Sequence, residues 1–162
     1  MEEVASHLRQ EALRRTDVRE RDNFGRSAFN RYYYSTFTAV DSALGSLRSE
    51  WHGQPHKTIP DLLRGQVMKS LKAGSRLASQ VGDQETVSAC QKAIALCHQL
   101  AQLMELGYAT RVTADYKADV QVDFRVGTDF SLASVPVSDA QQWPGRATAC
   151  TDSIRNAWRQ IT

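Results

Sequence analysis

Apolar residues spaced three and four apart over long stretches are the feature that most constrains the fold of this chain of 162 residues. This spacing matches the helical period and gives each stretch one apolar face. It predicts helices over residues 2–19, 23–51 and 59–79, from 83 to about 108, and from 138 to the C-terminus. Thr58 and Asp83 are the expected N-terminal caps of the third and fourth helices, and Pro144 indicates that the regular part of the last helix begins there. The broadest apolar face is predicted for the second helix; its members are Ala28, Tyr32, Tyr33, Phe37, Val40, Leu44 and Leu47. Four or five helices joined by short loops predict an all-α, four- to five-helix up-and-down bundle.

Residues 117–133 follow a different pattern. Apolar and polar residues alternate there, and the apolar members are Val120, Val122, Phe124 and Val126, with Gly127 following. The alternation predicts a short β-hairpin at 117–133 or, as the alternative, a long ordered loop. Because a two-stranded hairpin is marginally stable alone, it would need to pack on the helices or on a partner.

Composition and cysteine usage narrow the class of protein. The length and the lack of internal repeats predict one domain over 1–162. The three cysteines, Cys90, Cys97 and Cys150, are an odd number without a CxxC pair, which disfavours a disulfide framework and a zinc site. His7, His52 and His98 lack metal-ligand spacing to one another and to the cysteines, and no metal and no cofactor is expected. Without an apolar leader or a membrane-length apolar run, a cytoplasmic protein is expected.

Three segments carry a resemblance to a known family. Residues 26–44 read RSAFNRYYYSTFTAVDSAL, a histidine at position 56 precedes the next helix, and residues 111–116 read RVTADY. In this order, and over residues 20–162 apart from a longer insertion at 117–137, the chain resembles the HEPN family of RNA-linked helical proteins. The resemblance implies a helical bundle that acts as a homodimer in a bacterial defence or toxin–antitoxin system. It also implies RNA or a protein as partner.

The same resemblance points to particular residues. Catalytic HEPN proteins carry an arginine followed a few residues later by a histidine, and they cleave RNA without a metal. Here Arg111 is followed five positions later by Tyr116, and no histidine occurs after His98. Because a tyrosine is a poor base at neutral pH, the resemblance implies a binding or regulatory module. Family members often pair with a nucleotidyltransferase that modifies a tyrosine in some pairs, and Tyr116 is the candidate here.

Two other functions stay open. The first is a metal-independent ribonuclease in which Arg111 stabilises charge and Tyr116, Asp115 or His56 handles protons. The second is a structural helical adaptor without a nucleic-acid role. Arg111 and Asp115 are four residues apart, so on a helix they form either a structural ion pair or part of a site.

Two further arginines lie near the tyrosine cluster. Arg26 and Arg31 either are solvated helix charges or extend, with Arg111, a basic surface that binds RNA phosphate. His56 either bonds a backbone group at the helix entry or acts as a general acid or base.

Overall fold

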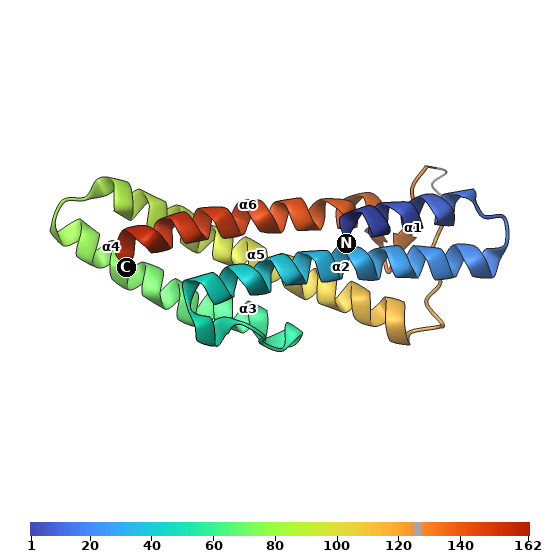
Figure 1. The fold of residues 1–162 in the computed structure, drawn as a ribbon, viewed down its shortest axis with the longest axis horizontal. Coiled ribbons are helices and arrows are strands. Elements are labelled where there is room, and N and C mark those ends of the chain that lie inside the picture. The colour runs from blue at the N-terminus through green and yellow to red at the C-terminus, as the bar shows by residue number, and fades with distance from the viewer. Residues whose placement is uncertain (125–127) are drawn as a thin grey trace. The chain divides into compact units, whose positions relative to one another are not determined.

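The computed structural model describes residues 1–124 and 128–162, and it confirms the predicted all-α class, because 81% of the described residues are helical. The helices are α1 (Glu2–Arg14), α2 (Val18–Leu47), α3 (Ile59–Leu62), α4 (Met68–Gln80), α5 (Gln84–Tyr116) and α6 (Val137–Ile161) (Figure 1). Short 3-10 turns, η1 (Ser49–Trp51) and η2 (His56–Thr58), follow α2, and a π-helical turn, η3 (Leu63–Val67), joins α3 to α4. Among the described residues, no helix has the length and apolar content that crossing a membrane requires.

The expected hairpin is present, but its strands lie later in the sequence than the alternating run. Strands β1 (Ser131–Leu132) and β2 (Val135–Pro136) pair antiparallel. The two residues between them, Ala133 and Ser134, have φ values of 49° and 68°, as a tight hairpin turn requires. Within the alternating run, Asp123 forms an isolated bridge with Ser131. Val126 and Gly127 of that run lie outside the described residues.

The chain divides into two compact units. Unit 1 comprises residues Met1–Phe37 and Leu106–Gly145, and unit 2 comprises Thr38–Glu105 and Arg146–Thr162. Helices α2, α5 and α6 each contribute residues to both units. The predicted apolar faces therefore divide between two cores.

In unit 1, α1 runs antiparallel to the first part of α2 (Figure 1). The hydroxyl of Ser35 donates a hydrogen bond to Glu2, and the hydroxyls of Ser6 and Tyr32 lie 3.3 Å apart. The core beneath these helices is rich in aromatic rings and small residues; it contains Ala5, Ala12, Ala28, Phe29, Tyr32, Tyr33, Phe130, Leu132, Ala140 and Trp143.

In unit 2, the core is supplied by α3, α4, the turns η1 and η3, and parts of α2, α5 and α6. Its members include Val40, Leu44, Trp51, Ile59, Leu63, Leu71, Cys97, Leu100, Ile154 and Trp158. The rings of Trp51 and Trp158 meet edge to face, with centroids 5.4 Å apart. The buried carboxylate of Asp41 fastens the turn after α2, because it accepts the Gly53 amide at 2.8 Å and pairs with His52 at 2.9 Å.

The helix ends test the predicted caps. Asp83 caps α5 as predicted, because its carboxylate accepts both the amide and the hydroxyl of Thr86. Thr58 does not cap α3 with its side chain; its hydroxyl donates to the carbonyl of Pro55 instead. Helix α6 begins at Val137 and continues through Pro144 rather than starting there.

Candidate functional site

The predicted RVTADY segment forms the last turns of α5, where it packs on α2 within unit 1. Arg111 and Asp115 lie one turn apart on α5, and Asn30 and Tyr34 lie one turn apart on α2. Arg111 Nη2 donates to the Tyr34 hydroxyl at 3.0 Å, and Asn30 Nδ2 donates to Asp115 Oδ1 at 2.5 Å. Two polar contacts therefore bridge the helices at successive turns.

The guanidinium of Arg111 is held on several sides. Its Nε lies 2.8 Å from Asp115 Oδ2, which confirms the ion pair expected from their spacing. Its Cζ lies 5.7 Å from the ring centroid of Tyr34 and 5.4 Å from that of Tyr116, within the range of cation–π attraction. The Arg111 side chain is 18% exposed. The guanidinium thus stays near the surface in a fixed orientation.

Tyr116 is the most accessible member of the site. It is the last residue of α5 and is 73% exposed, although its ring lies beside the guanidinium of Arg111. A large exposed aromatic ring next to a cation is typical of surfaces on which a base or another planar group stacks. We call Asn30, Tyr34, Arg111, Asp115 and Tyr116 the arginine–tyrosine site.

The charge of Arg111 is stabilised by its neighbours. Burial alone would lower its pKa, but the hydrogen bond with Tyr34 and the charge of Asp115 raise the pKa above its usual value. Arg111 therefore acts as a permanent cation and not as a proton carrier.

The three consecutive tyrosines separate into different roles, as successive helix residues must. Tyr32 and Tyr33 are buried in the core of unit 1, whereas Tyr34 is half-buried and reaches Arg111. Burial raises the pKa of Tyr33 well above its usual range. The spacing of the cluster predicted this division, but it did not identify which hydroxyl would reach the site.

Arg26 is engaged inside the protein. Its guanidinium pairs with Asp22 at 2.5 Å and donates to the carbonyls of Thr113, Ala114, Lys117 and Val120. The carbonyls of Thr113 and Ala114 belong to the last turn of α5, where helical amides run out, and the Thr113 carbonyl also accepts the amide of Lys117. Arg26 is therefore not the solvated helix charge that the sequence offered as one alternative: it has a structural role inside unit 1, and its donors are used there rather than by a phosphate.

The other predicted residues lie elsewhere. Arg31 is exposed on α2, one residue after Asn30. His56 is the first residue of η2 and belongs to unit 2. The site is therefore built from residues of unit 1 alone. Among the described residues, there is no group of three or more His, Cys, Asp or Glu side chains that could hold a metal ion.

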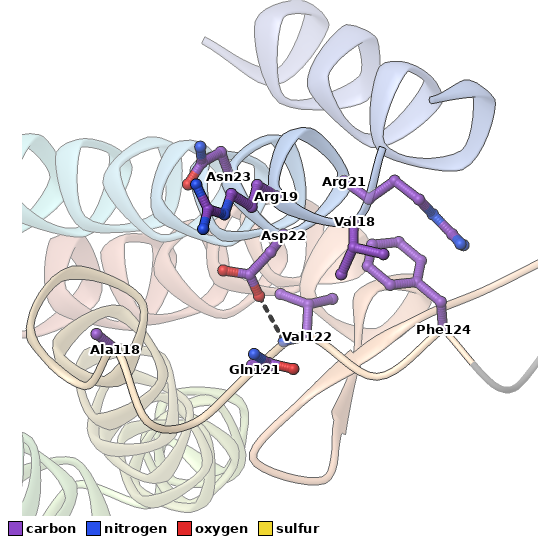
Figure 2. Close-up of a pocket in the computed structure, with 9 residues that line it drawn as sticks. All are labelled: Val18, Arg19, Arg21, Asp22, Asn23, Ala118, Gln121, Val122 and Phe124. Atoms are coloured by element: carbon purple, nitrogen blue, oxygen red, sulfur yellow. Dashed lines mark hydrogen bonds between the residues drawn. The ribbon is translucent and has the colours of Figure 1, made fainter. Parts of the chain in front are cut away.

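A pocket of about 220 Å³ lies beside the start of α2, and sequence reasoning did not identify it. Figure 2 shows its lining residues: Val18, Arg19, Arg21, Asp22, Asn23, Ala118, Gln121, Val122 and Phe124. Asp22 accepts the amide of Val122 at 2.7 Å, and the guanidinium of Arg21 lies 4.0 Å from the Phe124 ring centroid. These contacts fasten the segment after α5 to α2. No local sequence signal marked them, because the partners are about 100 residues apart.

Comparisons of the chain with protein-family models, curated proteins and solved structures found no match. The resemblance to the HEPN family therefore stays a prediction based on the three sequence segments.

Proposed function

We propose that this chain is a HEPN-like helical module that binds single-stranded RNA through the arginine–tyrosine site. The observation that supports this function is the position of the Arg111 guanidinium between Tyr34 and the exposed ring of Tyr116. An exposed ring can stack on a base, and a fixed guanidinium can bind the adjacent phosphate. In the part of the chain that the structure describes, Asp115 pairs with Nε of Arg111 and the Tyr34 hydroxyl accepts from Nη2, so we assign Nη1 to the phosphate.

Binding fits these residues better than cleavage does. Arg111 contacts two tyrosines and a carboxylate, and its permanent charge prevents it from acting as a base. The position of the histidine in catalytic HEPN proteins is occupied by Tyr116. The proposed module therefore holds RNA, or presents itself to a partner protein, in a bacterial defence or toxin–antitoxin system.

The decisive experiment compares two substitutions of the same residue. Tyr116→Ala removes the stacking ring, whereas Tyr116→Phe keeps the ring and removes only the hydroxyl. We expect Tyr116→Ala to weaken binding of a labelled single-stranded RNA by about 1–3 kcal/mol, the usual contribution of one stacked base. Tyr116→Phe should bind like the wild type. Fluorescence anisotropy at low salt measures both affinities.

Arg111→Ala should also weaken RNA binding. The matched control is Arg14→Ala, which removes an arginine that is 79% exposed and pairs only within α1. Equal affinities for wild type, Tyr116→Ala and Arg111→Ala would disprove the proposed site.

The ribonuclease alternative is tested with the same proteins. RNA is incubated with excess protein in the presence of a chelator, and the products are separated on a denaturing gel. We expect intact RNA. Cleavage that disappears in Arg111→Ala would replace the binding function with metal-independent hydrolysis or transesterification.

The expected partners give two further readouts. Light scattering should report a homodimer at micromolar concentration.

If a nucleotidyltransferase is the partner, the exposed phenol of Tyr116 is accessible to modification. Its oxygen would attack the α-phosphate of a nucleoside triphosphate and release pyrophosphate. Mass spectrometry should then find the nucleotide on wild type and Arg14→Ala but not on Tyr116→Phe.

A further inference from the structure

A basic groove follows the exposed side of η3 and α4 in unit 2. It is lined by Arg64, Gly65, Lys69, Lys72, Ala73 and Arg76 and has a volume of about 390 Å³. Lys69, Lys72 and Arg76 are spaced three and four residues apart, so they share one face of α4. All three are exposed. The groove therefore presents a row of cations to solvent.

The charge of this segment differs from that of the whole chain. The chain has 20 basic and 18 acidic residues, but residues 62–82 contain Arg64, Lys69, Lys72 and Arg76 and no aspartate or glutamate. Arg64 is neutralised by Glu105, to which it donates from both Nη atoms. Within the part of the chain that the structure describes, Lys69, Lys72 and Arg76 form no ion pair. Their positive potential is therefore uncompensated locally.

The backbone of the groove is also unusual. Gly65 lies in the π-helical turn η3, and a Cβ atom added there would meet nothing within 4 Å. Glycine is unfavourable inside a helix, and π-helical turns are frequent at functional sites. The turn is anchored from its other side, because Gln66 accepts the indole N–H of Trp51 at 3.1 Å. Packing thus gives no reason for Gly65, whereas close approach of a ligand would.

The spacing of the cations indicates the kind of ligand. At a rise of 1.5 Å per residue, Lys69, Lys72 and Arg76 follow one another at about 4.5 and 6 Å along the helix axis. A row on this scale suits successive phosphates of one extended strand better than a single small anion. The opposite face of α4 is buried through Met68, Leu71 and Ala78. The apolar side chains that stay exposed, Leu77 and Val81, lie at the C-terminal end of the helix and do not line the groove.

We propose that the basic groove binds the phosphate backbone of single-stranded RNA. The inference rests on the proposed function, which makes RNA the partner, and it adds a second contact surface on unit 2. Lys69, Lys72 and Arg76 neutralise phosphates without reading bases, and Gly65 leaves room for the sugar–phosphate chain.

The test compares two triple variants that remove the same charge. The groove variant, K69Q/K72Q/R76Q, lacks the three unpaired cations of the groove. The control variant, R14Q/K92Q/R159Q, lacks three exposed cations elsewhere on the protein. The probe is a labelled 20-nucleotide uridine RNA, titrated by fluorescence anisotropy over a series of salt concentrations. All substituted side chains are exposed, and circular dichroism with thermal melting verifies folding.

The groove variant should bind at least tenfold more weakly at low salt, and the control variant within twofold of wild type. Loss of three phosphate contacts should also reduce the slope of log K against log salt by about two, since each contact on a single strand contributes roughly 0.7. Unchanged affinity of the groove variant, or equal losses in both triple variants, would overturn the proposal. So would wild-type protein that binds no RNA at low salt.

Two comparisons separate this inference from other outcomes. If Tyr116→Ala binds normally while the groove variant loses binding, the arginine–tyrosine site fails and the groove stands. The reverse result overturns the groove and leaves the arginine–tyrosine site. Vesicles containing phosphatidylserine test binding to a membrane. If the wild type binds these vesicles, the groove variant does not, and added RNA fails to displace the wild type, the groove binds lipid instead.

Discussion

Arg26 of α2 contacts the C-terminal part of α5, and Arg111 belongs to that part of the helix. Their surroundings nevertheless give the two arginines different roles. Arg26 is 12% exposed, and its donors reach one carboxylate and four backbone carbonyls. Arg111 lies beside an exposed aromatic ring and is bonded at only two of its nitrogens in the described contacts. The first is a helix cap, and the second is available to a ligand.

Substitution of Arg26 should therefore affect stability. Arg26→Ala leaves Asp22 with the Val122 amide but without its cation, and it removes the side-chain donor from four backbone carbonyls. We therefore expect a loss of about 3 kcal/mol in the free energy of unfolding. Chemical denaturation followed by circular dichroism measures the loss. Arg14→Ala serves as the control, because that side chain is 79% exposed. A loss as small as that of the control would contradict the capping role.

Sequence reasoning identified part of the site, and the limit has a physical cause. The Arg111–Asp115 pair follows from a spacing of four within one helix, so it was predictable. Asn30 and Tyr34 join the site only because α2 packs on α5, a contact between residues 77–85 positions apart. The role of Arg26 depends on where α5 ends. The sequence predicted that this helix ends at about Tyr108, but α5 continues to Tyr116, so the contacts of Arg26 with its last turn could not be foreseen.

At the scale of the element, the helical period and capping chemistry explain most of the agreement between the predicted helices and those of the structure. Asp83 was recognisable as a cap because aspartate before an amphipathic run bonds the free amides of the first turn. The short hairpin was harder to place, since Val122 packs against α2 instead of continuing a strand. The Val122 side chain lies beside Gly25 of α2, where a Cβ atom added to the glycine would be 3.1 Å from it, so packing on α2 outweighs the alternating pattern.

The cap at Asp83 predicts a pH dependence. Hydrogen bonds from the amide and hydroxyl of Thr86 lower the pKa of Asp83 below its ordinary value of 3.8. Its contribution to stability is therefore present above pH 3.8 and is lost as the pH falls through the lowered value. Asp83→Asn retains a capping oxygen that does not titrate. The difference in Tm between wild type and Asp83→Asn should shrink on acidification; a constant difference from pH 6 to pH 2 would contradict the prediction.

Two helical glycines should respond in opposite directions to alanine. At Gly107 a Cβ atom would lie 2.9 Å from Cδ2 of the buried Tyr33, so Gly107→Ala should destabilise the fold by about 1–3 kcal/mol. At Gly65 the space is open, and Gly65→Ala should stabilise it by about 0.5–1 kcal/mol. Urea unfolding of both variants checks the signs. A destabilised Gly65→Ala protein would show that the π-helical turn requires glycine for its own conformation.

At the scale of the whole molecule, the rate at which the three cysteines react measures how often unit 2 opens, because all three lie in that unit. Burial raises the pKa of Cys90 and Cys150, and it raises the pKa of Cys97, assisted by Cys150, to about 12. Since only the thiolate reacts, the folded protein at pH 8 should be labelled slowly by an aromatic disulfide reagent. Labelling should begin at the half-buried Cys150, and a Cys150→Ser variant should lack that first phase.

Labelling in denaturant completes this test. Unfolding removes the burial that protects the thiols, so all three cysteines should then react within the time that a free thiol needs. Rapid labelling of Cys97 without denaturant would mean that the core of unit 2 opens far more often than its burial implies.

The interleaving of the two units has a consequence for how the protein can be divided. Each unit takes residues from two separated stretches of the polypeptide, and α2, α5 and α6 supply both. No single cut in the gene can therefore separate the two units into two complete fragments. A recombination event that transfers one continuous stretch of the gene cannot transfer one unit without part of the other. The two RNA-binding surfaces proposed here, one on each unit, would therefore be inherited together.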